Sequence, residues 1–182
     1  MLLKDLKEAE ALRTITLPLI VPSEKEVLDS KELDLSWSAL NACYSKPLVN
    51  EKTGRIQSWY DVQIIIEGED NLPSRKEWFY LVTDCGFLCK ACFAGKKVKW
   101  LSTFEDSEII GGWIKSKLAD EFELIDGFDY VYQDQRKWGV ITKEVLEDYG
   151  GKQIILKKTN ITKKDKKGIE RDVWFISFPY KL

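Results

Sequence analysis

The sequence predicts a mainly β domain of the α+β class, with seven or eight strands and two or three short helices placed between strands. Two observations support this prediction. Short runs rich in β-branched and aromatic residues recur along the chain, and most end near glycine, proline or aspartate. Apolar residues at helical spacing occur in only a few short segments. This pattern fits both a sandwich and a barrel, and it does not separate them.

The amino-terminal region is expected to begin as a helix and continue as a strand. Residues 2–12 form a short amphipathic pattern with apolar residues on one side. Residues 13–21 are rich in alternating β-branched residues, which predicts a strand, and Pro18 favours a position at a sheet edge. The acidic residues 22–33 are expected to form a loop.

The remaining strands follow the same signals. They are expected at residues 33–37, 59–67, 77–84, 86–93, 97–102, 152–159 and 171–178. Cys85-Gly86 joins two of them, which predicts a hairpin. The lysine-rich residues 160–169 are expected to form a loop before the last strand.

Two helices are predicted between these strands. Thr103 and Asp106 fit a capping box at the start of the first helix. Its apolar stripe consists of Ile109, Ile110, Trp113, Ile114 and Leu118. The second helix is expected from Thr142 to Tyr149, with a stop at Gly150-Gly151. Residues 121–137 are aromatic and acidic without a clear period, and we interpret them as an insertion.

The composition indicates one packed domain inside the cell. The chain has 182 residues, of which 44% are hydrophobic and 12% aromatic, and this is enough for a single core. No apolar run approaches the roughly 20 residues of a membrane helix. The first residues are mixed in charge and do not resemble a signal peptide. We therefore expect a cytoplasmic protein with no membrane partner.

The chain contains no histidine, which excludes several kinds of catalytic centre. Ser-His and Cys-His nucleophilic pairs, histidine-containing metal sites and the usual general base are all removed. No glycine-rich phosphate loop is present, because Gly111-Gly112 falls within a predicted helix and is better explained by close helix packing. We expect no catalytic centre and no cofactor.

The spacing of the cysteines matches only part of a zinc site. Cys85, Cys89 and Cys92, with the distant Cys43, have part of the spacing of a four-cysteine site. Cys89 and Cys92 are expected inside one strand, on opposite faces, and no glycine turn separates them. Buried or half-buried thiols are therefore the favoured interpretation, and no metal is expected.

A metal-dependent nuclease is a second alternative with little support. Such an enzyme places carboxylates and a lysine at neighbouring strand ends, where they hold magnesium and orient water. Asp5-Leu6-Lys7 and Asp29-Ser30-Lys31 match only in residue type, because the first falls in a predicted helix and the second in a predicted loop.

Charge is sorted along the chain, although the formal net charge is only -2. Residues 1–34 and 103–130 are mostly acidic, whereas residues 86–102 and 152–171 are mostly basic. This distribution fits a protein with one basic and one acidic face, and it also fits a set of solvated loops.

Two connections between strands combine basic and aromatic residues. One extends from Tyr44 to Trp59 and the other from Lys90 to Trp100. Lysine supplies salt-dependent affinity for phosphates. Arginine and glutamine can pair with base edges through two hydrogen bonds, each pair worth roughly 1–3 kcal/mol of discrimination. From the pattern alone, nucleic-acid contact and ordinary surface loops both remain open.

Four blocks of the sequence follow one another in a familiar order. The first block is Leu35-Ser36-Trp37-Ser38 with the basic loop after it. The second comprises Thr83-Asp84-Cys85-Gly86, Lys99-Trp100-Leu101 and the helix from Ile110-Gly111 to Lys117-Leu118. The third is Leu146 with Tyr149-Gly150, and the fourth is the strand 173–178. Together they resemble the B-three-like DNA-binding domains of type II restriction endonucleases, of the EcoRII effector-domain and BfiI C-terminal-domain type. Plant B-three transcription-factor domains are similar. The two glycines that flank the family's tryptophan are absent.

The resemblance implies a seven-stranded open pseudobarrel that grips the DNA major groove with two arms. The chain would be a single DNA-binding domain over residues 1–182, with an N-terminal helix at 1–12 and the pseudobarrel at 13–178, interrupted by the insertion 121–137. By this analogy the arms are residues 44–59 and 88–100. The implied DNA-binding residues are Ser45, Lys46, Arg55, Gln57, Ser58, Trp59, Lys90, Lys96, Lys97, Lys99 and Trp100.

Roles within the arms also follow from the resemblance. Arg55, Gln57, Lys90 and Lys97 are expected near base edges. Phosphates are expected at Lys46, Lys96 and Lys99, and the two tryptophans are expected to brace the arms. The partner is then double-stranded DNA, with a nuclease domain in the parent restriction endonuclease of a prokaryotic cell. A chain numbered from Met1 fits an N-terminal effector domain or a renumbered fragment. A protein-interaction β-domain with solvated basic loops remains the main alternative.

Overall fold

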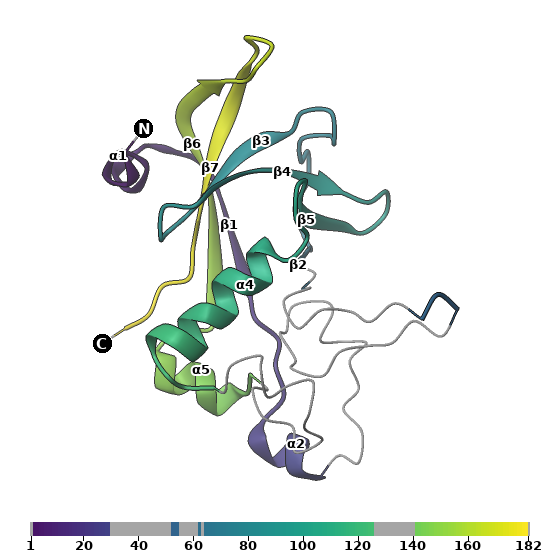
Figure 1. The fold of residues 1–182 in the computed structure, drawn as a ribbon, viewed down its shortest axis with the longest axis vertical. Helices are drawn as coiled ribbons and strands as arrows, with labels where there is room; N and C mark the ends of the chain where they lie inside the picture. The colour runs from purple at the N-terminus through teal and green to yellow at the C-terminus, as the bar shows by residue number, and fades with distance from the viewer. Residues whose placement is uncertain (1, 30–51, 55–61, 63, 126–140, 182) are drawn as a thin grey trace. The chain divides into compact units, whose positions relative to one another are not determined.

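We describe the fold from a computed structural model, for residues 2–29, 52–54, 62, 64–125 and 141–181. Figure 1 shows the order of the elements along the chain. The strands are β1 (Ala11–Pro18), β2 (Ile64–Ile66), β3 (Phe79–Thr83), β4 (Leu88–Ala94), β5 (Lys99–Thr103), β6 (Gln153–Lys164) and β7 (Glu170–Ser177). The α-helices are α1 (Leu3–Glu8), α2 (Glu24–Asp29), α4 (Ile109–Ser116) and α5 (Lys143–Tyr149), and a π-helical turn, η1 (Lys117–Glu121), continues α4. No helix in these ranges has the length and apolar character needed to cross a membrane.

The seven strands form one mixed sheet in the order β1-β6-β7-β3-β4-β5-β2. Strands β3 and β7 are parallel, with Tyr80 opposite Val173. Consecutive strands in the pairs β3–β4, β4–β5 and β6–β7 are antiparallel, and so is the pair of β1 with β6. The sheet is an open half-barrel, so the predicted seven-stranded, mainly β pseudobarrel is confirmed.

The chain divides into two compact units, and it passes between them several times. The first unit comprises Met1–Pro18, Ile65–Asp106 and Gln153–Pro179. The second comprises Leu19–Ile64, Ser107–Lys152 and Tyr180–Leu182. Most of the sheet belongs to the first unit, and helices α2, α4 and α5 belong to the second.

One face of the β3–β7 pair in the first unit is closed by aromatic side chains. The rings of Phe79, Phe93 and Trp174 lie 5.0–5.5 Å apart, centroid to centroid. All three side chains are fully buried. Ring pairs at these distances add roughly 0.5–1.5 kcal/mol beyond the area they bury. We call this side of the two strands the Phe79 face.

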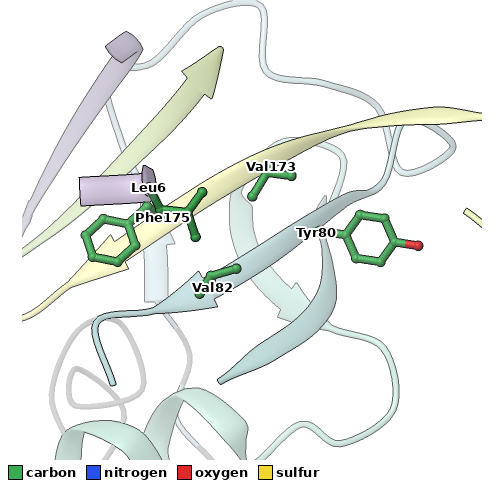
Figure 2. Packing of buried hydrophobic residues seen from close by; sticks show 5 residues of the cluster. All are labelled: Leu6, Tyr80, Val82, Val173 and Phe175. Carbon is green, nitrogen blue, oxygen red and sulfur yellow. The ribbon is translucent and has the colours of Figure 1, made fainter. Parts of the chain in front are cut away.

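The opposite side of the same two strands, which we call the Tyr80 face, packs against helix α1. Its buried cluster consists of Leu6, Tyr80, Val82, Val173 and Phe175. Figure 2 shows Leu6 beside Phe175 at one end of this cluster and Tyr80 at the other, with the Tyr80 hydroxyl directed away from it.

Helix α1 is fixed at its end by a lysine from β6. The ammonium group of Lys157 donates hydrogen bonds to the carbonyl oxygens of Leu6, Lys7 and Ala9, at 2.8, 3.1 and 3.2 Å. A cation is favourable at this position, because the last carbonyls of a helix have no partner within the helix. The predicted N-terminal helix is therefore present but shorter than residues 2–12, and the chain is already a strand at Ala11.

The second unit contains the helix that local signals predicted best. Helix α5 starts after Thr142, whose hydroxyl accepts a hydrogen bond from Val145 N at 3.2 Å. It ends at Gly150, which has a left-handed φ of 83° and donates to the Leu146 carbonyl. A Cβ at Gly150 would collide with the Lys181 backbone, so a glycine is required there.

Three predicted local structures were wrong. Residues 24–29 form helix α2 and not a loop. Strand β6 continues to Lys164, so half of the predicted loop 160–169 is paired strand. Helix α4 begins only at Ile109, and the Thr103 hydroxyl bonds to the Asp106 carbonyl oxygen instead of capping the helix.

Other predicted elements are confirmed in part or fall outside the described residues. Strand β2 occupies the end of the predicted strand 59–67, and β3 and β4 form the predicted hairpin. The beginning of the expected insertion at 121–137 holds Phe122, whose ring packs against Tyr149 and Tyr180 at 5.0 and 4.9 Å. The predicted strand 33–37 and residues 126–137 lie outside the described residues.

Candidate nucleic-acid interface

The β4–β5 hairpin of the first unit contains the second arm expected from the sequence. Its strands pair from Ala91 opposite Thr103 to Ala94 opposite Trp100. Gly95 follows with a φ of +95°, a conformation that side chains rarely adopt. A Cβ there would also collide with the Val98 carbonyl oxygen and lie 2.7 Å from Cζ3 of Trp100. The turn is therefore tightly folded against the Trp100 ring.

The lysines of this arm fall into two groups. Lys96 and Lys97 are exposed at the tip of the turn, beside Val98, which is 54% exposed. Lys99 is half-buried, and its ammonium group donates to the Gly95 carbonyl oxygen at 2.6 Å. Lys99 thus braces the turn in this structure, whereas the two tip lysines present their charges to solvent.

Lys90 lies on β4 and is also held in place. Its ammonium group is 5.2 Å from the centroid of the Trp78 ring. Trp78 precedes β3 and is half-buried. A cation above an indole face is stabilised by roughly 0.5–1 kcal/mol when exposed and more when desolvated. The Lys90 charge therefore lies on the Tyr80 face, where the Trp78 ring favours this position.

Little of the first arm belongs to the described residues. Ser45, Lys46, Arg55, Gln57, Ser58 and Trp59 all lie outside them. From this connection the structure describes the turn Lys52–Gly54, in which Gly54 has a φ of 68°. The structure therefore brings together only the second-arm candidates, which are Lys90, Lys96, Lys97, Lys99 and Trp100.

A second group of cations, which was not predicted from the sequence, lies on the Tyr80 face. Arg171 lies with its guanidinium carbon 4.2 Å from the centroid of the same Trp78 ring that Lys90 approaches. The ammonium group of Lys163 lies 5.2 Å from the Tyr80 ring. Trp78 and Tyr80 themselves meet edge to face at 5.3 Å. The density of lysines at 152–171 was the only signal of this cluster in the sequence.

Three of the four cysteines, Cys85, Cys89 and Cys92, lie in the described part of the chain, and all three are free thiols. Strand β3 ends at Thr83 and β4 begins at Leu88, so Cys85 lies in the turn of the predicted hairpin, and Cys89 and Cys92 lie on β4. Burial, followed by the charge of Glu105, raises the pKa of Cys89 to about 12, so this thiol stays protonated at neutral pH. In the described part of the chain, no three His, Cys, Asp or Glu side chains gather as metal ligands would.

The two acid-x-lysine patterns lie on helices as far as they are described. Asp5 is in α1, where its carboxylate accepts a hydrogen bond from Leu2 N at 3.2 Å, and Leu6 beside it is buried. Asp29 is the last residue of α2.

The fold and the arm define a class of protein. An open half-barrel of seven strands is the pseudobarrel that the resemblance to B3-like domains implies, and here it carries the lysine-bearing β4–β5 hairpin. The family model of the NgoFVII C-terminal B3-like DNA-binding domain matches residues 27–160. The chain belongs to this family, which is a DNA-binding domain of restriction endonucleases, and its partner is DNA. No curated protein matches the sequence.

Proposed function

We propose that this chain recognises a short sequence in double-stranded DNA through two arms, residues 44–59 and 88–100, that enter the major groove. It would serve as the target-binding or effector domain of a restriction endonuclease, with the nuclease domain elsewhere in the parent protein. Because its ligand is DNA, we place it inside a prokaryotic cell. We also propose that the two compact units act together as one DNA-binding domain.

The observation that carries this proposal is the tip of the β4–β5 hairpin. The major groove of B-form DNA is about 12 Å wide and admits a two-stranded β-ribbon. Lys96 and Lys97 are exposed at the tip of such a ribbon, and the ribbon lies within the residues that match the DNA-binding family. Gly95, Lys99 and Trp100 fix the shape of the turn, which limits the entropy lost when the tip contacts DNA.

Binding to a pool of random duplexes, followed by sequencing of the bound fraction, tests the specificity claim. We expect enrichment of one short motif. Binding without any enriched motif, lost by about 0.15 M salt, would overturn the proposal and favour a general basic surface.

Two single variants test the roles within the arm. If Lys97 contacts a base edge, Lys97→Ala relaxes specificity at one position of the motif. If Lys96 contacts a phosphate, Lys96→Ala weakens binding to all duplexes alike and lowers the slope of log K against log salt by about 1. Lys25→Ala, on the exposed side of α2, is the matched control and should change neither quantity. Magnesium-dependent cleavage of DNA by the unchanged chain would instead support the nuclease alternative.

A further inference from the structure

The outer half of the β6–β7 hairpin is a two-stranded ribbon without sheet neighbours. Among the described residues, β1 pairs with β6 only as far as Thr159, and β3 pairs with β7 only from Val173 onward. Asn160 N still donates to the Glu10 carbonyl oxygen just before β1, and further out the described strands pair only with each other, from Thr162 opposite Asp172 to Lys164 opposite Glu170. Figure 1 shows this hairpin extending past β1 and β3. We call residues 161–172 the β6–β7 ribbon.

The ribbon makes polar contacts of its own at its tip and at its base. At its tip, the Asp165 carboxylate accepts hydrogen bonds from Lys167 N at 2.8 Å and Ile169 N at 3.0 Å, and it pairs with Arg171 at 3.1 Å. At its base, the buried Thr159 hydroxyl donates to the Val173 carbonyl oxygen at 2.6 Å, where the strand register shifts. An isolated hairpin is marginal in water, so these contacts help to hold the ribbon in its paired conformation.

The ribbon carries more basic than acidic side chains, and two of its three acidic side chains form ion pairs. Its cations are Lys163, Lys164, Lys166, Lys167 and Arg171, and its acids are Asp165, Glu170 and Asp172. Asp165 is paired with Arg171, and Asp172 lies 3.6 Å from the ammonium group of Lys158. Lys164, Lys166 and Lys167 are exposed. The positive charges at the tip therefore face solvent.

The ribbon is continuous with the second arm through Trp78. Arg171 from the ribbon and Lys90 from β4 both lie against this ring. Arg171 also donates to the Lys76 carbonyl oxygen at 3.1 Å, which brings the exposed Arg75-Lys76 turn beside the ribbon. Because the faces of Trp78 and Tyr80 are engaged by cations, stacked bases are not the ligand that this surface fits best.

We propose that the β6–β7 ribbon is an additional contact for the phosphate backbone of double-stranded DNA, outside the base pairs that the two arms read. This inference rests on the proposed function. Lysines act on phosphates as point charges without base preference, so the ribbon adds affinity and orientation but no specificity. Its lysines lie beyond residues 27–160, so the match to the family does not account for them.

The test compares the unchanged chain with the triple variant Lys164→Gln, Lys166→Gln and Lys167→Gln. The duplexes carry the enriched motif, with long flanks or trimmed to the motif itself. Each lost phosphate contact lowers the slope of log K against log salt by about 0.9, so up to about 2.7 is expected on the long duplex. Affinity for the long duplex at low salt should fall about tenfold or more, while the ratio of specific to non-specific binding stays the same. On the trimmed duplex the variant should bind like the unchanged chain.

A second triple variant removes the same charge elsewhere. Lys4→Gln, Lys25→Gln and Lys143→Gln change three exposed lysines on α1, α2 and at the start of α5, and should leave the slope unchanged. Equal slopes for the unchanged chain and the ribbon variant would overturn the ribbon proposal and leave recognition by the arms standing. A lack of any enriched motif with the unchanged chain would overturn the proposed function instead. The single variant Lys166→Glu, with a circular dichroism spectrum, repeats the test if the triple variant folds poorly.

Discussion

The Phe79 face and the Tyr80 face are built from alternate residues of the same two strands, yet they are covered by different kinds of side chain. On the Phe79 face, the rings of Phe79, Phe93 and Trp174 pack against one another, and all three are fully buried. On the Tyr80 face, helix α1 covers one end through Leu6, and the other end is covered by cations resting on Tyr80 and on the half-buried Trp78.

Desolvation explains why the cations that rest on rings lie on the Tyr80 face, whereas Lys158, opposite Trp174 on the other face, stays partly exposed and pairs with Asp172. Moving a charge into a closed apolar core costs several kcal/mol even when it is paired. A cation above a half-exposed ring keeps part of its water and still gains the attraction of the ring. The comparison indicates that the Phe79 face supplies stability, whereas the open end of the Tyr80 face positions charges. Substitutions on the two faces should therefore separate unfolding from DNA binding.

The largest effect is expected for Trp174→Ala on the Phe79 face. Removing this buried indole should lower the free energy of unfolding by about 3–5 kcal/mol, because the cavity cannot collapse between Phe79 and Phe93. The indole Nε1 has no hydrogen-bond partner among the described residues, so no polar contact is lost. Urea denaturation measures this change.

Trp78→Ala on the Tyr80 face is the matched comparison. Trp78 is half-buried, so its loss should cost clearly less stability than that of Trp174. It should, however, weaken DNA binding, because Lys90 and Arg171 lose the ring that positions them. Equal losses of stability for the two tryptophans would contradict the division of roles between the faces.

A smaller effect is expected from Gly95→Ala in the β4–β5 turn. A side chain in the left-handed region costs roughly 1–2 kcal/mol by itself. At Gly95 the new methyl group would also collide with Val98 and Trp100, so the turn must change shape. We expect a loss of DNA affinity greater than the loss of stability, measured by mobility shift and by urea denaturation on the same sample.

Gly168→Ala in the ribbon turn measures the conformational cost of a side chain at a positive φ without any steric collision. Gly168 has a similar φ of 81°, but a Cβ there meets nothing within 4 Å. This variant should show only the conformational cost and keep the affinity of the arm for the trimmed duplex. If Gly95→Ala behaved like Gly168→Ala in both assays, the shape of the arm turn would not matter for binding.

Elements with local signals could be predicted from the sequence, and elements held by distant partners could not. Helix α5 has its caps, Thr142 and Gly150, within its own segment. Helix α2 has no comparable apolar pattern, and it is held by α5: Glu24 N donates to the Glu144 carboxylate at 2.9 Å, and Lys143 N donates to the Pro22 carbonyl oxygen at 2.9 Å. A segment whose partners are more than a hundred residues away gives no local signal.

The same reason explains what was missed at the candidate interface. Residues 160–164 are mostly polar and lack the alternation of a half-buried strand, so they were interpreted as a loop. Their pairing with β7 makes them a strand. The contact of Lys90 and Arg171 with one tryptophan joins three distant parts of the chain, and it depends on the parallel pairing of β3 with β7. The tip lysines Lys96 and Lys97 were found because a glycine turn between two short strands is a local pattern.

The smallest effect concerns acid and the tip of the β6–β7 ribbon. Partial enclosure opposes ionisation of Asp165, but hydrogen bonds from Ile169 N, Arg171 and Lys167 N outweigh it and hold the pKa below its usual value. A lowered pKa in the folded state means that the ionised carboxylate stabilises the tip above the unfolded-state pKa of about 3.9. This stabilisation is lost as the pH falls through the lower, folded-state pKa.

A proton-detected NMR titration between neutral pH and acid follows this loss at the amides of Lys167 and Ile169. Both resonances should move together with an apparent pKa below that of an unfolded aspartate. The variant Asp165→Asn keeps an acceptor oxygen but carries no charge, so the transition should vanish from both amides. The buried amide of Trp174 should not respond in this pH range, because its side chain is fully buried against the rings of Phe79 and Phe93. A shared transition at the tip and at Trp174 would show instead that acid unfolds the strands as a whole, and that the ribbon is not an independently stabilised element.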